Sequence, residues 1–149
     1  MARPYDQQTM ITKINHIAIV VPDLEEGVGF WADALGMELG NVEDVPSQAV
    51  RVGFFEVGES HLELVEPTTE DSGIAKYLAK RGPGIHHLCL EVDDLEAALA
   101  QLKAKNVPLI NEEPIEAAGG NRAAFIHPKG TGGVLVELYE VNRNEKLEE

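Results

Sequence analysis

Two histidines and two glutamates stand in this chain at matching intervals, and these residue types can together bind a divalent metal ion. His16 and Glu63 lie 47 positions apart, and His87 and Glu137 lie 50 positions apart. Two imidazoles and two carboxylates suit an octahedral Co²⁺, Ni²⁺, Zn²⁺ or Mn²⁺ ion that keeps two positions open for a substrate. The pattern indicates a catalytic metal site, because a structural zinc site fills its positions with protein ligands.

These four residues belong to an internal repeat. The stretch "INHIAIVVPDLEEGV" (Ile14–Val28) aligns with "IHHLCLEVDDLEAAL" (Ile85–Leu99) at an offset of 71 residues. The stretch "HLELVEP" (His61–Pro67) aligns with "LVELYEV" (Leu135–Val141) at an offset of 74 residues. Such self-similarity is typical of a structural unit that is used twice, and one loop insertion accounts for the difference between the offsets.

Each copy of the repeat reads as a strand, a helix and further strands. Alternating apolar residues predict a strand at 14–21, and Asp23 is a suitable N-cap for a helix that Gly36 ends. Its predicted apolar stripe is Leu24, Val28, Trp31 and Leu35. A second helix should begin after Asp94 in the same way. We predict a single α+β domain of residues 1–149, made of a module at 12–70, a connecting helix at 71–82 and a module at 83–142.

Strand alternation separates the two adjacent histidines in "GIHHLCLEVDD", because neighbouring side chains on a strand point to opposite faces. The large apolar residues of this stretch share the face of His86 and should pack against helices. His87 shares its face with the small side chain of Cys89, as His16 does with Ala18. We therefore predict His87 as the ligand and His86 as a bystander on the apolar face or at its rim.

Composition limits the partners and the location of the protein. Its 149 residues are 44% hydrophobic, which suffices for one core, and its net charge of −14 argues against nucleic acid and anionic membranes as partners. The single cysteine, Cys89, excludes an intrachain disulfide, and neither a signal peptide nor an apolar run of about 20 residues is visible. We expect a cytoplasmic protein that binds a small molecule.

The doubled His and Glu pattern resembles that of the vicinal-oxygen-chelate superfamily, which includes glyoxalase I, extradiol dioxygenases and methylmalonyl-CoA epimerases. The stretches "DSGIAKYLAKRGPGIHH" and "GGNRAAFIHPK" are most similar to the epimerases, and the similar segments span most of residues 14–140. The resemblance implies two βαβββ modules whose curved, mostly antiparallel sheet encloses the metal site, and a homodimer. It implies a set of four ligands with Co²⁺ as the first expectation: His16, Glu63, His87 and Glu137.

The resemblance also implies a metal-dependent epimerase that interconverts the 2R and 2S forms of methylmalonyl-CoA through a metal-stabilised enolate. The α-proton between a thioester and a carboxylate is moderately acidic, and a divalent ion stabilises the enolate left by its removal. Epimerisation takes a proton from one face and returns one to the other, which favours two acid/base groups. The "GGNR" loop is expected to contact the acyl-CoA substrate through Asn121 and Arg122.

The stretch "VPSQAV" departs from the epimerase pattern. The family commonly has Pro-Glu-x-x-Val here, with the glutamate as one base, whereas this chain has Ser47 and Gln48, which we keep as substrate-contact positions. An unassisted serine hydroxyl is a poor base near neutral pH. Three explanations stay open: Glu137 or Glu63 is the catalytic base, which is the first expectation; Glu43 or Asp44 reaches the substrate; or the reaction is a different one on a similar acyl-CoA.

A second function shares the same ligand pattern. A glyoxalase I-like lyase acting on a glutathione hemithioacetal needs only one effective base, so Ser47 favours it, whereas the epimerase-like stretches oppose it. A drug-binding protein of the superfamily usually lacks the full ligand set, and an extradiol dioxygenase usually has three ligands. His61, two residues before Glu63 on the same face, could line the cleft, but a solvent-exposed rim is the first expectation.

Overall fold

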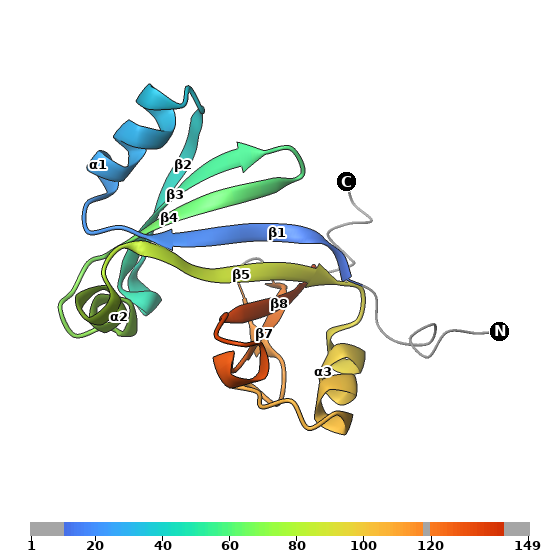
Figure 1. Cartoon of the computed structure of the whole chain (residues 1–149). Coiled ribbons are helices and arrows are strands. Elements are labelled where there is room, and N and C mark those ends of the chain that lie inside the picture. Colours follow the sequence, from blue (N-terminus) through green and yellow to red (C-terminus); the bar gives the residue numbers. More distant parts are fainter. Residues whose placement is uncertain (1–10, 118–119, 142–149) are drawn as a thin grey trace. The chain divides into compact units, whose positions relative to one another are not determined.

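The computed structural model describes residues 11–117 and 120–141. Residues 1–10, 118–119 and 142–149 lie outside it, and they include both ends of the predicted domain and residue 142 of the second module. The described strands form an eight-stranded sheet in the order β2-β3-β4-β1-β5-β8-β7-β6 (Figure 1). The predicted α+β class is confirmed. None of the described helices is both long enough and apolar enough to cross a membrane.

The chain forms two compact units, a first unit of His16–His87 and a second unit of Met1–Asn15 with Leu88–Glu149. Strands β1 (Ile11–Val20) and β5 (Gly84–Val92) contribute residues to both units. The other elements of the first unit are α1 (Leu24–Val28), a π-helical segment η1 (Gly29–Ala34), β2 (Leu39–Val45), a 3₁₀ turn η2 (Pro46–Gln48), β3 (Val50–Val57), β4 (Ser60–Pro67) and α2 (Gly73–Arg81). The second unit adds α3 (Leu95–Ala104), β6 (Ile115–Glu116), β7 (Arg122–Ile126), a 3₁₀ turn η4 (Pro128–Gly130) and β8 (Val136–Glu140).

Strand pairing within the units follows the repeat. In the first unit β4 pairs with β1 in parallel and with β3 antiparallel, and β2 pairs antiparallel with β3. In the second unit β8 pairs with β5 in parallel and with β7 antiparallel, and β6 pairs antiparallel with β7. The parallel registers place Ala18 beside Glu63 and Cys89 beside Glu137. Each glutamate thus sits beside the residue two positions after a predicted histidine ligand, Glu63 after His16 and Glu137 after His87.

The first helix differs from its prediction in its second half. It begins at the predicted cap, where the Asp23 side chain accepts a hydrogen bond from the Glu26 amide, but it continues as the π-helical segment Gly29–Ala34. A π-helix has more residues per turn than an α-helix, so the predicted stripe drifts around the axis. Leu35 is consequently 56% exposed, whereas Trp31 packs against the core beside Phe55. Gly36, with φ of 79°, follows this segment.

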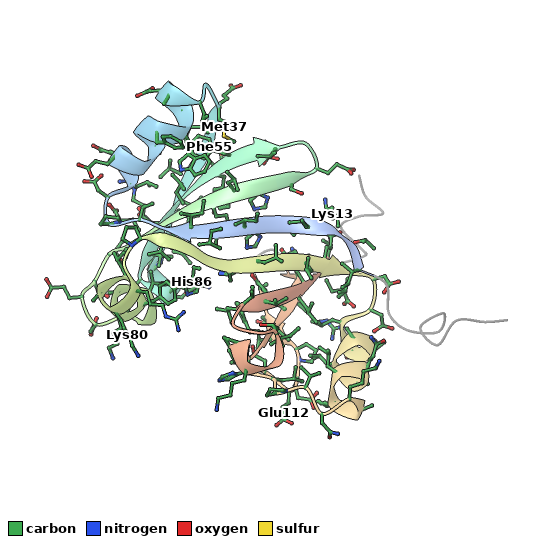
Figure 2. All side chains as sticks on the ribbon, in the orientation of Figure 1. Lys13, Met37, Phe55, Lys80, His86 and Glu112 are labelled. Atoms are coloured by element: carbon green, nitrogen blue, oxygen red, sulfur yellow. The ribbon has the colours of Figure 1, made fainter. Side chains whose placement is uncertain are left out.

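The two faces of the first unit's sheet carry different residues, as strand alternation predicts. One face packs against α1 through Leu24, Phe55 and Leu64, with Met37 at its edge (Figure 2). The opposite face carries His16, Ala18 and Glu63, and a second cluster forms there around Ala18, Val52 and Val65. Ile74 of α2 packs against this second cluster, so a helix also covers part of this face.

The second unit repeats this division into two faces. Leu90 and Val92 of β5 pack with Leu95 and Leu99 of α3, as predicted for the apolar face. Cys89 and Glu91 alternate with them on the opposite face, and both are buried. The face with Glu137 and Tyr139 is therefore the one directed away from α3.

The repeat contains a second pair of equivalent glutamates, Glu66 on β4 and Glu140 on β8, and each of them contacts a helix. Glu66 Oε2 accepts a hydrogen bond from the Leu24 amide at 2.9 Å, and Glu140 Oε2 accepts one from the Leu95 amide at 2.7 Å. These amides lie in the first turns of α1 and α3, where backbone donors have no partner within the helix and the helix dipole favours a negative charge. The repeated glutamates therefore tie each helix to its sheet.

Removal of Glu140 should destabilise the protein. Glu140→Ala leaves the Leu95 amide without its acceptor and removes an ion pair of the partly exposed Arg122, so we expect a loss of about 1–2 kcal/mol in the free energy of unfolding. Glu140→Gln keeps an oxygen acceptor and should lose less. Urea denaturation measures both. Equal stability of Glu140→Ala and the exposed-site control Glu116→Ala would contradict this role.

Candidate functional site

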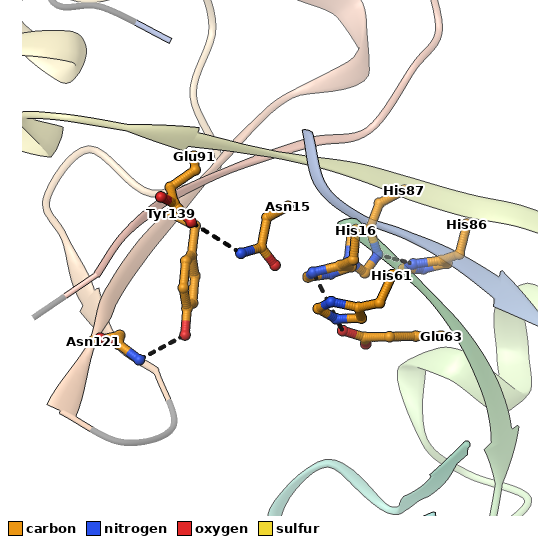
Figure 3. A network of polar contacts seen from close by, with 9 residues as sticks. All are labelled: Asn15, His16, His61, Glu63, His86, His87, Glu91, Asn121 and Tyr139. Atoms are coloured by element: carbon orange, nitrogen blue, oxygen red, sulfur yellow. Dashed lines mark hydrogen bonds and ion pairs between the residues drawn. The ribbon is translucent and has the colours of Figure 1, made fainter. Parts of the chain in front are cut away.

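Four histidines and a glutamate from three strands gather in the first unit (Figure 3). His16 lies on β1, His61 and Glu63 lie on β4, and His86 and His87 lie on β5. The parallel register of β1 and β4 sets His16 beside His61. Strands that are distant in sequence therefore bring the two predicted histidine ligands and two further histidines together with one predicted glutamate.

The two ring nitrogens of His16 face different groups. Its Nε2 lies 3.2 Å from Nε2 of His87, and its Nδ1 lies 3.2 Å from Oε2 of Glu63. His16 is only 7% exposed, so both contacts are shielded from solvent. The Nε2 atoms of the two predicted histidine ligands thus point toward one another, while Nδ1 of His16 is held by a carboxylate.

His61 occupies a different place from the predicted solvent-exposed rim. Its Nε2 lies 2.9 Å from Oε2 of Glu63, and its ring stacks on His16 with 5.0 Å between the centroids. Its side chain is only 22% exposed. The sequence prediction was wrong because the ring packs against neighbouring strands, with Phe54 of β3 on another side. A cavity of about 260 Å³ adjoins it, lined by Gly40, Asn41, Glu43, Phe54, Glu56 and His61.

His86 contacts His87 directly, which the alternation of strand faces did not predict. Nδ1 of His86 lies 2.8 Å from Nδ1 of His87, and the His86 ring meets Tyr77 of α2 edge-on at 4.6 Å. Burial, followed by the charge on His87, lowers the pKa of His86 from 6.5 to about 4. The ring is therefore neutral near pH 7 and can accept a hydrogen bond. Only knowledge of the helix packed beside β5 could have revealed this contact.

The donor set of the first unit fits a divalent metal ion. Two ligands at adjacent positions around an ion, each bonded at about 2.1 Å, would lie roughly 3 Å apart, and the Nε2 atoms of His16 and His87 are 3.2 Å apart. Three donor atoms of His16, His61 and Glu63 also lie within 4.8 Å of one another. Imidazole nitrogens with a carboxylate oxygen suit Co²⁺, Ni²⁺ or Zn²⁺. Two of the four predicted ligands, His16 and His87, therefore face each other through Nε2, and a third, Glu63, contacts Nδ1 of His16.

Glu137, the fourth predicted ligand, belongs to the second unit. It stands on β8 in register with Cys89 of β5, two positions after His87. Glu63 has the same relation to Ala18, two positions after His16. Cys89 is fully buried.

The second unit has a polar cluster of its own on the same sheet face as Glu137 (Figure 3). Asn15 Nδ2 donates to Oε1 of the buried Glu91 at 3.1 Å, and Asn121 Nδ2 donates to the Tyr139 hydroxyl at 2.7 Å. Burial is the largest cause that raises the pKa of Tyr139, so this hydroxyl keeps its proton at neutral pH. Of the two predicted substrate contacts in the "GGNR" loop, Asn121 lies in this cluster.

Arg122, the other predicted contact in that loop, forms ion pairs next to α3. Its guanidinium donates to Glu140 at 2.8 Å and to Glu96 at 3.0 Å. These hydrogen bonds, that to Glu140 first, raise the pKa of Arg122 above its ordinary value. The face alternation of β8 separates Glu140 from Tyr139, so Arg122 and Asn121 serve opposite faces of the sheet.

Ser47 and Gln48 lie in the exposed 3₁₀ turn η2, between β2 and β3. The turn ends at Ala49, whose φ of 55° lies in the left-handed region. Of the two carboxylates that could replace the missing base, Glu43 lines the cavity beside His61. Asp44 instead lies 3.9 Å from Arg51 in an exposed ion pair.

Comparisons with known proteins agree with this fold. The chain is 40% identical over 142 residues to the mitochondrial methylmalonyl-CoA epimerase of Homo sapiens, covering 92% of this chain and 81% of that protein. It is 41% identical to an ethylmalonyl-CoA/methylmalonyl-CoA epimerase of Cereibacter sphaeroides, covering 89% of this chain and 100% of that protein. A solved structure of a methylmalonyl-CoA epimerase in complex with methylmalonyl-CoA and NH₄⁺ matches with a TM-score of 0.79 at 37% identity, covering 88% of this chain and 95% of that chain.

A family model also matches most of the chain. It describes the Glyoxalase/Bleomycin resistance protein/Dioxygenase superfamily, and the match spans residues 15–125. That span contains His16, Glu63 and His87, which meet in the first unit. The chain therefore belongs to the Glyoxalase/Bleomycin resistance protein/Dioxygenase superfamily and has its glyoxalase-like fold.

Proposed function

We propose that this protein is a metal-dependent epimerase that interconverts the 2R and 2S forms of methylmalonyl-CoA. The observation that carries the proposal is the 3.2 Å approach of Nε2 of His16 to Nε2 of His87, in a chain about 40% identical to epimerases of this substrate. The short distance between the two histidines supports one metal ion bound by both of them. The similarity to epimerases supports an isomerisation of an acyl-CoA as the reaction.

His16, Glu63, His87 and Glu137 are the residues that would hold the ion. His16 and His87 offer Nε2 atoms that point toward each other. Glu63 Oε2 lies at the other ring nitrogen of His16, Nδ1, so the Glu63 side chain would have to turn to join an ion held between the two Nε2 atoms. The matching register of Glu137 in the second unit supports its inclusion. A bound divalent ion would act as a Lewis acid toward the carboxylate and thioester oxygens of the substrate. Co²⁺ is our first expectation, and Ni²⁺, Zn²⁺ and Mn²⁺ also suit these donors.

Proton transfer needs a base on each side of the α-carbon, and this chain has serine where the family commonly has one of them. We assign the transfers to Glu137 and Glu63, the carboxylates on the last strands of the two units. Glu63 is 17% exposed, and its Oε2 is held by His61 and His16, which fixes its direction. Glu43, which lines the adjoining cavity, is the alternative to Glu63.

Substrate contacts are assigned to Asn121, Ser47 and Gln48. Asn121 shares its cluster with the Tyr139 hydroxyl, and both groups can donate a hydrogen bond. Ser47 and Gln48 are exposed and have side chains that can do the same. Arg122 remains an expected contact by resemblance, although its bonds to Glu140 and Glu96 account for its position. A homodimer in the cytoplasm stays a prediction of the sequence.

The proposed reaction predicts exchange of the substrate α-proton with solvent. The protein loaded with Co²⁺, Ni²⁺, Zn²⁺ or Mn²⁺ is incubated in D₂O with (2R)-methylmalonyl-CoA, and NMR follows loss of the α-proton signal. We expect exchange accompanied by the 2S form, and parallel samples with ethylmalonyl-CoA test a longer substituent. Turnover of methylglyoxal with glutathione, without exchange in the acyl-CoA with any of these ions, would replace the epimerase by a glyoxalase I-like lyase.

Loss of Glu137 should abolish metal binding and activity together. Glu137→Ala removes a carboxylate that we assign to both roles, so we expect metal affinity to fall by more than about 100-fold, beyond the effect of losing an outer hydrogen-bond partner. Competition with a chromophoric chelator measures affinity, and the D₂O assay measures turnover. The control is Glu112→Ala, an exposed acid of the same unit. Full turnover by Glu137→Ala would refute the assignment.

A glutamate at position 47 should accelerate the reaction. Ser47→Glu restores the carboxylate of the family pattern in an exposed turn, and a positioned general base contributes about 100-fold or more to a rate. We expect at least about a tenfold increase in α-proton exchange, because the new carboxylate supplies a second base. Thr69→Glu, which adds the same charge at another exposed site of the first unit, should leave the rate unchanged. An unchanged rate in both variants would show that η2 does not reach the substrate.

A further inference from the structure

We infer that His86 is a positioning residue that holds the His87 ring with Nε2 directed toward the metal ion. The inference rests on the metal site of the proposed function. His86 was expected to be a bystander, yet its ring nitrogen makes one of the shortest polar contacts of the first unit, 2.8 Å from Nδ1 of His87. A histidine that binds a metal through one nitrogen usually donates its other N–H to a fixed acceptor, which sets the tautomer and the orientation of the ring.

The contacts of His87 indicate which of its ring nitrogens would bind the ion and which would donate a hydrogen bond to His86. Nε2 faces Nε2 of His16 at 3.2 Å, and Nδ1 faces Nδ1 of His86. When Nε2 of His87 offers its lone pair to an ion, the ring proton must be on Nδ1, because a neutral imidazole carries one N–H. Nδ1 of His86 then has to be the acceptor, with its own proton on Nε2.

The His86 ring is itself fixed by α2. The Tyr77 ring meets it edge-on with 4.6 Å between the centroids, and the Tyr77 hydroxyl donates to the carbonyl of Ile85 at 3.1 Å. The Arg81 guanidinium lies 5.3 Å from the centre of the Tyr77 ring (Figure 2 shows His86 beside this helix). Two contacts from one tyrosine therefore anchor the start of β5, and the anchored ring presents its acceptor to His87.

His16 has an analogous partner on the other side of the site. Its Nδ1 lies 3.2 Å from Glu63, as Nδ1 of His87 lies 2.8 Å from His86. The two facing Nε2 atoms are thus each backed by an acceptor on the far side of the ring. A carboxylate oxygen does this for one histidine and a ring nitrogen of a second histidine does it for the other.

Two substitutions of His86 distinguish its role as a hydrogen-bond acceptor from the packing of its ring against Tyr77. His86→Phe keeps an aromatic ring against Tyr77 but removes the acceptor for the Nδ1 proton of His87. His86→Asn is the matched control, because its amide oxygen can take the place of Nδ1 and accept the same bond. Zn²⁺ and Co²⁺ affinities are measured by competition with a chromophoric chelator. Long-range ¹H–¹⁵N NMR correlations of the Zn²⁺-loaded protein report which nitrogen of His87 carries the proton.

We expect His86→Phe to weaken binding of both ions by about 10–100-fold, the usual cost of losing an outer partner of a metal ligand. His86→Asn should bind close to the wild-type level. In the wild-type protein the ring proton of His87 should be on Nδ1 and should exchange slowly with water. Rescue by asparagine is the result that a purely structural role of the ring would not produce.

Unchanged affinity in a folded His86→Phe protein would overturn the inference, as would a wild-type His87 proton found on Nε2. The wild-type spectrum and His86→Asn decide the matter even if His86→Phe does not fold. Failure of the wild-type protein to bind any divalent ion would overturn the metal site and this role together. The expected pattern of metal affinities, weakened in His86→Phe and close to wild type in His86→Asn, without α-proton exchange in the wild-type protein would reject the epimerase alone and leave the role of His86 intact.

Discussion

The close approach of the buried imidazole of His16 and the partly buried imidazole of His87 is the interaction on which the rest of the first unit depends. Nε2 of His16 and Nε2 of His87 lie 3.2 Å apart on different strands. Two nitrogen lone pairs at this distance need a proton or a cation between them, because they otherwise repel each other. The partners behind the rings, Glu63 for one and His86 for the other, complete an arrangement that favours a cation.

The duplicated architecture explains why the ligand pattern recurs. In each unit a parallel strand pair places a glutamate beside the position two residues after a histidine. A second glutamate on the same strand, Glu66 or Glu140, turns to the opposite face and accepts a hydrogen bond from the first turn of a helix. One strand thus serves the site on one face and the helix on the other, since its side chains alternate.

The two copies of the repeat differ in the residues that lie on the sheet face with the predicted ligands. The first unit fills part of its site-bearing face with Ala18, Val52 and Val65 and covers it with α2. The second unit has polar pairs on the corresponding face, including Asn121 with Tyr139.

The sequence predicted the α+β class, the helix caps at Asp23 and Asp94, and the face shared by His16 and Ala18, and the structure confirms them. These features follow from local rules: side-chain periodicity, cap chemistry and the self-similarity of the chain. The exposure of Leu35 was not predictable in this way, since it depends on a π-helical segment that a helical stripe does not reveal.

The sequence by itself determined the residue types of the site and the strands that carry them. Only the tertiary structure decided which nitrogen of each ring faces its neighbour, that His61 binds Glu63 instead of lying at a rim, and that His86 contacts His87. The physical reason is that these contacts depend on side-chain torsions set by packing across strands and against α2. Strand alternation determines the sheet face on which a side chain lies, whereas packing against neighbouring residues determines the positions of its ring nitrogens.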